Sequence, residues 1–219
     1  MKVHIFDIDH TLIKGSTAFY FLIEALRKKQ LSLKSLLGLP FQWFLYKLAI
    51  IDPEFIENQI HFLKGIKEET IRKLNEEAFK LYTKKNIFKE ACELIEGLKK
   101  KGNRIIFATS SFNVIIDPLM DFFKINEALS SNLEVVDGKC TGKITGEALF
   151  ANKKLTAVAS WLVREGIDFK DVYFYSDSYN DLPTLEAAGN PIAVNPDRRL
   201  LKKASKQGWP ILKFKETLK

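Results

Sequence analysis

The segment that most constrains the fold lies at the start of the chain, where a short, mostly apolar run ends in two acids. Val3 to Ile8 is rich in β-branched side chains, which predicts a strand buried on both faces of a parallel sheet. Asp7 and Asp9 fall at its carboxyl end. Because open α/β sheets bind ligands beyond the carboxyl ends of their strands, we expect both acids to lie in a site.

The rest of the chain is first purely helical and then alternates between helices and strands. Residues 14–84 show helical patterns with no strand predicted among them, and are expected to form an all-helical insertion after the first strand. Residues 1–13 and 85–219 are expected to form an α/β domain, a doubly wound and mostly parallel sheet with helices on both faces. The predicted helices are 16–29, 32–50, 52–63, 67–85, 88–101, 113–123, 152–164, 181–188 and 196–206. The predicted strands after the first are 104–108, 127–131, 133–136, 172–175, 192–194 and 209–212, with a hairpin partner near 143–144.

Composition narrows the class of protein. A chain of 219 residues with 46% hydrophobic content supports one core and a small accessory domain. The net charge of +7 comes mainly from lysines spread along helices, so we interpret it as solvated helix faces and expect no nucleic-acid partner. Cys92 and Cys140 lack metal-ligand spacing and predict reduced thiols. With no pattern typical of a cleavable signal, we expect a cytoplasmic protein.

Residues 36–51 form the one segment that raises the question of a membrane. They are apolar and carry several aromatic side chains within 41–46, but Pro40 and Lys47 interrupt them, and the run is shorter than the ~20 apolar residues that span a bilayer. We therefore expect no stable membrane insertion. Three interpretations of the aromatic residues stay open: core of a helical bundle, a greasy substrate pocket, or a surface for peripheral lipid contact.

Polar side chains follow two further predicted strands and open one helix. Thr109, Ser110 and Ser111 end the strand at 104–108, and Asp177 to Asp181 follow the strand at 172–175. Lys153 and Lys154 lie at the start of the helix at 152–164. Carboxylates, hydroxyls and an ammonium around one crevice are the groups that phosphoryl transfer requires.

The acids can be assigned to the steps of phosphate ester hydrolysis. Asp7 can attack phosphorus and form an aspartyl-phosphate, while Asp9 can protonate the leaving alkoxide and later activate water. Asp7 and Asp177, and with them Asp181, offer the hard oxygen ligands that suit Mg²⁺.

Other polar groups are candidates for holding the phosphate. Thr109 and the amide of Ser110 can bind a phosphoryl oxygen, and Lys154, or else Lys153, can balance its charge. The candidate catalytic residues are therefore Asp7, Asp9, Thr109 and Lys154. The candidate substrate contacts are Thr11, Ser110, Ser111 and Asn180.

These motifs together resemble those of the haloacid dehalogenase-like hydrolases. The resemblance rests on Asp7-Ile8-Asp9-His10-Thr11, Thr109, Lys154 and the segment from Asp177 to Asp181. The helical insertion is similar to the cap of the phosphoserine phosphatase-like subfamily IB. The resemblance implies a Rossmann-like core and a Mg²⁺-dependent phosphatase with Asp7 as nucleophile and Asp9 as acid and base. It also implies that Asp9 binds Mg²⁺ through its main-chain carbonyl, Asp177 is the third protein ligand, and Asp181 orders the lysine or a metal-bound water.

Two departures from that subfamily bear on the substrate. Phosphoserine phosphatases have an acidic residue just after the first motif, where this chain has Gly15-Ser16-Thr17, and they carry a cap arginine near a segment similar to 62–65, where this chain has Glu57, Asn58 and Gln59. Phosphoserine is therefore not favoured, although Arg72 or a lysine could replace the arginine.

The sequence thus predicts a Mg²⁺-dependent phosphatase that hydrolyses a small-molecule phosphate monoester and exists as a monomer or homodimer. Two alternatives remain. One is a phosphotransferase that passes the phosphoryl group to an acceptor alcohol. The other is a non-catalytic protein that binds an anion, a lipid or nucleic acid through its basic charge and keeps a vestigial site.

Overall fold

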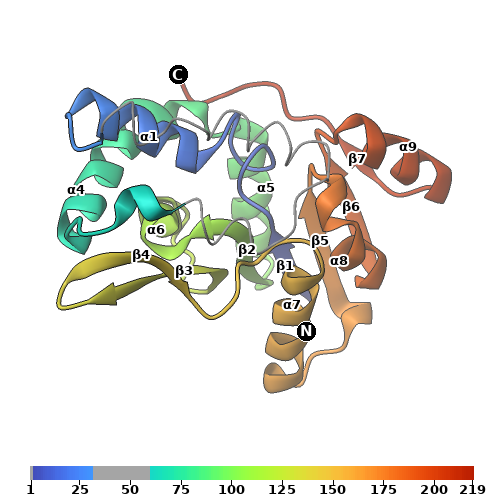
Figure 1. Cartoon of the computed structure of the whole chain (residues 1–219). Coiled ribbons are helices and arrows are strands. Elements are labelled where there is room, and N and C mark those ends of the chain that lie inside the picture. The colour runs from blue at the N-terminus through green and yellow to red at the C-terminus, as the bar shows by residue number, and fades with distance from the viewer. Residues whose placement is uncertain (1, 32–59) are drawn as a thin grey trace.

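The computed structural model describes residues 2–31 and 60–219, and its centre is a seven-stranded sheet (Figure 1). The strand order is β4-β3-β2-β1-β5-β6-β7. Every neighbouring pair is parallel except β3 and β4, which form an antiparallel hairpin at one edge. The strands are β1 (Val3–Phe6), β2 (Arg104–Phe112), β3 (Ala128–Val136), β4 (Lys139–Thr145), β5 (Val172–Ser176), β6 (Asn190–Val194) and β7 (Ile211–Leu212).

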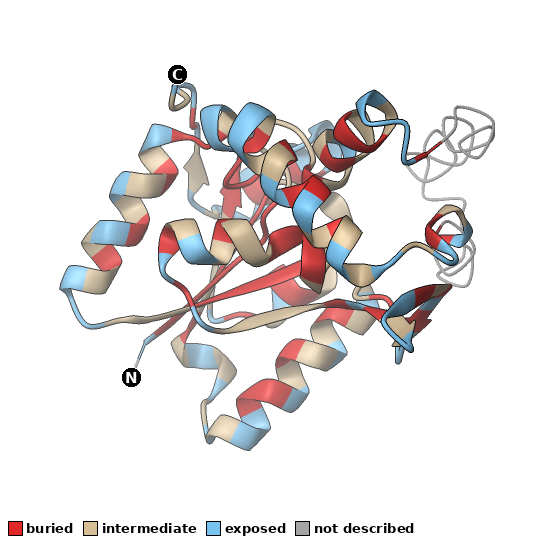
Figure 2. Cartoon of the chain, turned by 90° about the vertical axis from the view of Figure 1, so that its left-hand side faces the viewer, coloured by how far each residue is buried: buried red, intermediate tan, exposed pale blue. Residues whose placement is uncertain are grey.

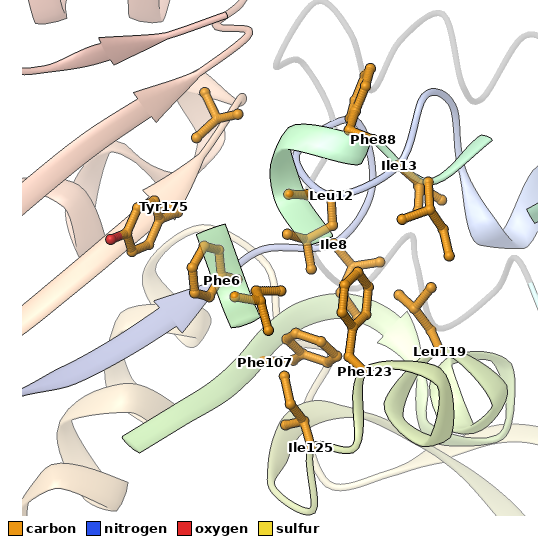
Figure 3. Close-up of a cluster of buried hydrophobic side chains, with 14 of the residues drawn as sticks. Phe6, Ile8, Leu12, Ile13, Phe88, Phe107, Leu119, Phe123, Ile125 and Tyr175 are labelled. Atoms are coloured by element: carbon orange, nitrogen blue, oxygen red, sulfur yellow. The ribbon is translucent and has the colours of Figure 1, made fainter. Parts of the chain in front are cut away.

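Helices cover both faces of the sheet, as expected for a doubly wound fold. Helices α5 (Lys89–Lys100) and α6 (Asn113–Phe123) pack on one face with Phe6 and Phe107, in the cluster that Figure 3 shows. Val3 and Ile5 point to the other face, because side chains alternate along a strand. There they meet α7 (Asn152–Glu165), α8 (Leu182–Ala187) and α9 (Arg198–Gln207). Buried residues accordingly follow the strands and the inner helix faces (Figure 2).

The described part of the insertion packs against one end of the core. Helices α1 (Thr17–Arg27) and α4 (Glu68–Ala78) lie beside each other, near α6 and the β3–β4 hairpin (Figure 1). A third apolar cluster joins these elements. The buried Asn75 amide of α4 donates to the carbonyls of Val114 and Ile115 at 2.9 and 2.8 Å. The domain boundaries at 13/14 and 84/85 stay a prediction.

The two segments that connect the insertion to the core run side by side. Ile13 and Ile87 form an antiparallel bridge. On either side of it, the Lys14 amide donates to the Asn86 carbonyl and the Phe88 amide to the Leu12 carbonyl. The insertion therefore leaves and re-enters the core at one place.

Several predicted element bounds were wrong. The helix expected over 67–85 is α-helical only to Ala78 and continues as a π-helical turn, Phe79–Thr83, and a 3₁₀ turn, Lys84–Asn86. The strands expected at 127–131 and 133–136 are one strand, β3.

Part of the helical prediction lies outside the described residues. The helix at 32–50, most of the helix at 52–63 and the aromatic residues of 41–46 fall there. The end of the third helix is described as a 3₁₀ turn, His61–Leu63. Among residues 2–31 and 60–219, no helix is long and apolar enough to cross a membrane.

Candidate active site

Three adjacent central strands bring the predicted motifs to one edge of the sheet. In the register of β1 with its neighbours, Phe6 pairs with Phe107 on one side and Tyr175 on the other. Asp7 continues this pattern, since its amide donates to the Tyr175 carbonyl at 2.9 Å. Thr109 and Asp177 lie two residues beyond those paired positions. The motifs that contain Asp7, Thr109 and Asp177 therefore meet at this edge.

A buried lysine from α7 joins two of the carboxylates. Lys154 Nζ lies 2.9 Å from Asp7 Oδ1 and 2.8 Å from the Asp181 carboxylate. The Ser176 hydroxyl also donates to Asp181, at 2.7 Å. Lys153 lies instead 3.4 Å from Glu147. Of the two lysines left open by the sequence, Lys154 is therefore the one that contacts Asp7.

Burial and the neighbouring charges act in opposite directions on Asp7 and on Lys154. Burial raises the pKa of Asp7 to about 7, although the adjacent Lys154 favours the ionised form, and Asp181 and Asp9 add to the increase. Burial would lower the pKa of Lys154, but the carboxylates of Asp181 and Asp7 outweigh it and hold that pKa above its ordinary value. Lys154 is therefore a permanent cation in the site.

Thr11 lies between Asp7 and Asp177. Its hydroxyl oxygen is 3.4 Å from Asp7 Oδ2 and 3.2 Å from Asp177 Oδ1, and it accepts the Asp177 amide proton at 3.0 Å. A hydroxyl has one proton, so it can donate to only one of these carboxylates at a time. Burial and the neighbouring acids Asp7 and Asp181 raise the pKa of Asp177 well above its ordinary value. The acids from the two ends of the chain thus converge.

Asp9 turns away from this network and toward the insertion. Its Oδ1 accepts the Thr17 amide at 2.8 Å. Its Oδ2 accepts the hydroxyls of Ser16 at 3.2 Å and Ser111 at 3.0 Å. A serine or threonine before a helix, here Ser16 or Thr17, is expected to cap it. Ser16 does occupy the N-cap position, but its hydroxyl makes no capping bond and is used by Asp9.

The remaining predicted residues are distributed around the site. Thr109 is buried, and its hydroxyl oxygen accepts the Ser111 amide at 3.1 Å. Ser110 and Asn180 are partly exposed. The main-chain amide of Asn180 donates to the Ser178 hydroxyl oxygen at 3.2 Å, which fixes the loop after Asp177. The substrate contacts predicted for Thr11, Ser110, Ser111 and Asn180 stay predictions.

Sequence reasoning missed several hydroxyls that organise the site. The buried Ser131 hydroxyl donates to the Ser110 carbonyl at 3.1 Å and accepts the Leu149 amide at 3.0 Å. Ser176, Ser16 and Thr17 were not assigned to the site either. Ser176 directly precedes Asp177, and that position was the one available signal.

The donor set suits a hard cation held by few side chains. Asp7, Asp177 and Asp181 are the carboxylates of this site. Lys154 bonds Asp7 and Asp181, whereas Asp177 is bonded by Thr11. Within the described ranges, no group of three or more His, Cys, Asp or Glu side chains is arranged to hold a metal ion. Asp181, predicted as a ligand, has its carboxylate engaged by Lys154 and Ser176.

Comparison with known proteins places this geometry in a family. The family model for haloacid dehalogenase-like hydrolases matches residues 5–186, which includes every predicted site residue. The chain belongs to this family. The resemblance read from the four motifs is therefore confirmed, as is the α/β fold class.

Several relatives of this hydrolase carry phosphatase names. It is 30% identical over 220 residues to the phosphoserine phosphatase SerB1 of Mycobacterium tuberculosis, covering 96% of this chain and 70% of that protein. It is 29% identical over 213 residues to a probable phosphatase of the same organism, covering 95% and 74%. The prediction that the chain is a phosphatase is thereby confirmed.

Solved structures support the same fold. A Bordetella pertussis protein of unknown function matches with a TM-score of 0.86 at 24% identity, covering 96% of this hydrolase and 97% of that chain. A substrate-bound phosphoserine phosphatase complex matches with a TM-score of 0.71 at 23% identity, covering 96% and 92%. Likeness at this level of identity concerns the fold alone.

Proposed function

We propose that this protein is a Mg²⁺-dependent phosphatase that hydrolyses a small-molecule phosphate monoester through an aspartyl-phosphate on Asp7. The observation that carries the proposal is the placement of Asp7, whose two carboxylate oxygens face different partners. One oxygen lies 2.9 Å from Lys154, and the other shares the Thr11 hydroxyl with Asp177. A nucleophile beside a fixed cation and a second acid is what phosphoryl transfer requires.

The residues present fit Mg²⁺. Burial raises the pKa values of both Asp7 and Asp177, so a divalent cation between them would relieve the cost of holding two carboxylates together. The side chains of Asp7 and Asp177 and the main-chain carbonyl of Asp9 would hold the ion, with Asp181 acting on it through Lys154 or directly. When bound, Mg²⁺ supplies positive charge to the phosphoryl oxygens and keeps both carboxylates ionised.

The reaction proceeds in two steps that the protein's own groups can perform. A carboxylate oxygen of Asp7 forms a bond to phosphorus, the phosphorus–ester oxygen bond breaks, and Asp9 gives its proton to the leaving alkoxide. Water then attacks the aspartyl-phosphate, Asp9 takes the proton from that water, and the Asp7 carboxylate is released. Thr109 and the Ser110 main-chain amide hold a phosphoryl oxygen, and Lys154 balances the phosphoryl charge throughout.

The described residues argue against phosphoserine as substrate. In the segment after the first motif, Ser16 and Thr17 are engaged by Asp9, and no acidic side chain replaces them to recognise an ammonium. Arg72, the suggested carboxylate ligand, is paired with Glu68 and Asp117. Two relatives are a phosphoserine phosphatase and a histidinol-phosphatase. Both classes of ester therefore belong in a substrate panel, with sugar phosphates, nucleotides and phosphorylated lipids.

Asp7→Asn tests the proposal, because an amide cannot act as the nucleophile. We expect at least a ~1,000-fold loss of phosphate release from an aryl phosphate with Mg²⁺ present. Asp137→Asn is the matched control, since Asp137 is an exposed acid in the β3–β4 turn and should leave activity unchanged. Full activity of Asp7→Asn would exclude the aspartyl-phosphate.

A further inference from the structure

Asp9 is held by residues from both the core and the insertion. The Thr17 amide and the Ser16 hydroxyl lie at the start of α1, whereas Ser111 lies on β2 of the central sheet. Three donors thus fix the one carboxylate that would exchange protons in the proposed reaction. Ser16 and Asp9 are partly exposed, but Ser111 and Thr17 are buried, with 6% and 3% of their surface exposed.

The direction of the hydrogen bonds follows from the number of protons. Thr17 Oγ1 and Ser111 Oγ lie 2.9 Å apart, and either hydroxyl could donate. When Asp9 is ionised, Ser111 gives its single proton to the Asp9 carboxylate. The Thr17 hydroxyl must therefore donate to Ser111. A directed chain runs from Thr17 through Ser111 to Asp9 Oδ2, and it crosses from the insertion to the core.

The main chain of Ser111 is also held in place by a hydrogen bond. The Ser111 amide donates to the Thr109 hydroxyl oxygen at 3.1 Å, so the residue that would contact the phosphoryl group also fixes the residue that contacts Asp9. We propose that Ser111, oriented by the Thr17 hydroxyl, is a positioning residue that aims the Asp9 carboxylate at the leaving group of the substrate. This inference rests on the proposed function, in which Asp9 is the acid.

The role can be separated from a general structural effect by varying the leaving group. In 4-nitrophenyl phosphate the leaving group departs readily without a proton, whereas phenyl phosphate needs protonation more. A misplaced acid should therefore slow the second ester more than the first. The value of kcat/KM reports phosphoryl transfer to Asp7 and not the later attack of water, so it is the quantity to compare.

The experiment measures kcat/KM for both esters with Mg²⁺ present. For Ser111→Ala we expect a loss of about tenfold or more with phenyl phosphate and of less than about threefold with 4-nitrophenyl phosphate, carried by kcat more than by KM. Thr17→Val, which has nearly the same shape but no hydroxyl, should show the same imbalance to a smaller degree. Thr17→Ser restores the hydroxyl and should restore the wild-type ratio.

The outcomes separate this inference from the proposed function. Equal losses on both esters in Ser111→Ala and Thr17→Val, or a Thr17→Ser variant that behaves like Thr17→Val, would overturn the positioning role. If Ser111→Ala does not fold, the two Thr17 variants decide alone. Asp9→Asn should show the largest difference between the losses of kcat/KM on the two esters. If Asp9→Asn loses equally on both esters, Asp9 is not the acid, and this inference is overturned with that role. The nucleophilic role of Asp7 is tested independently by Asp7→Asn.

Discussion

At the scale of single residues, His4 shows how burial sets the charge of a group that is not among the candidate site residues. It lies in β1, stacks on Tyr173 with ring centroids 4.5 Å apart, and its Nδ1 is 2.9 Å from the Tyr175 hydroxyl. Burial, with a smaller contribution from Lys2, lowers its pKa from 6.5 to about 4. His4 is therefore neutral in the folded protein at neutral pH.

This shift predicts an acid-sensitive contribution to stability. As the pH falls from 6.5 toward 4, the unfolded chain binds a proton on His4 that the folded protein does not. The free energy of unfolding should therefore decrease across this window, by about 3 kcal/mol at most. His4→Gln cannot be protonated, so the stability difference between wild type and variant in urea unfolding should shrink as the pH is lowered. A difference that stays constant would contradict the prediction.

The charged groups of the site could be predicted from sequence, but the hydroxyls that orient them could not. Asp7, Asp177 and Lys154 follow from strand ends and helix starts, because parallel strands direct those ends to one edge. The partner of Ser16 could not be predicted in this way. A serine before a helix usually caps it. Only the fold shows that the Ser16 hydroxyl donates to Asp9 and makes no capping bond. The contacts of Ser111 and Thr17 depend on side-chain direction, which sequence spacing does not determine.

At the scale of elements, the turn between β1 and α1 is sensitive to the addition of a single methyl group. Gly15 has a φ of +102°, and an added Cβ would lie 2.5 Å from the Tyr20 hydroxyl oxygen. That hydroxyl donates to the Lys14 carbonyl, and the His10 amide donates to the Gly15 carbonyl at 3.0 Å. The turn therefore fixes the start of α1, where Ser16 and Thr17 reach Asp9.

Gly15→Ala should destabilise the protein and lower activity together. The positive φ costs about 1 kcal/mol for alanine, and the contact with Tyr20 adds to that cost and displaces the start of α1. Gly146→Ala is the control, since Gly146 has a φ of +76° and nothing lies within 4 Å of an added Cβ. The melting temperature and kcat should both fall more in Gly15→Ala than in Gly146→Ala. Adding Tyr20→Phe to Gly15→Ala should recover part of the loss. Equal effects of the two glycine substitutions would show that Tyr20 is not involved.

The predicted bounds of helices and strands were wrong where the local sequence pattern and the tertiary contacts disagree. Residues 67–85 have a continuous helical pattern, yet the α-helix changes to a π-helical turn at Phe79, near the place where the chain re-enters the core. Periodicity alone cannot predict that change. Asn132 falls between the two strands predicted at 127–131 and 133–136, but in the structure it pairs with Thr145, where β3 passes from β2 to its hairpin partner.

At the scale of the whole molecule, alternating helices and strands predicted the fold class because few topologies satisfy that pattern. What the pattern did not predict is how the described part of the insertion joins the core. The apolar residues Phe21 and Leu74 share one cluster with Val114 and Leu133, so α1 and α4 pack against the core and not only against each other. Long-range contacts of this kind leave no local signature in the sequence.

The balance of charge at the strand ends predicts how metal affects the stability of the whole chain. Asp7, Asp177 and Asp181 repel one another, and Lys154 offsets part of that repulsion. In a chelator, Asp177→Asn should unfold at a higher temperature than wild type, because it removes an acid whose ionisation is disfavoured by burial and by Asp7 and Asp181. Mg²⁺ at about 100 times its dissociation constant should stabilise wild type by about 2.7 kcal/mol, which corresponds to roughly 5–10 °C for a chain of this length. The variant should gain far less.

Thermal unfolding with and without Mg²⁺ measures both effects, with Asp137→Asn expected to respond like wild type. An equal gain in wild type and Asp177→Asn would mean that Mg²⁺ binds elsewhere.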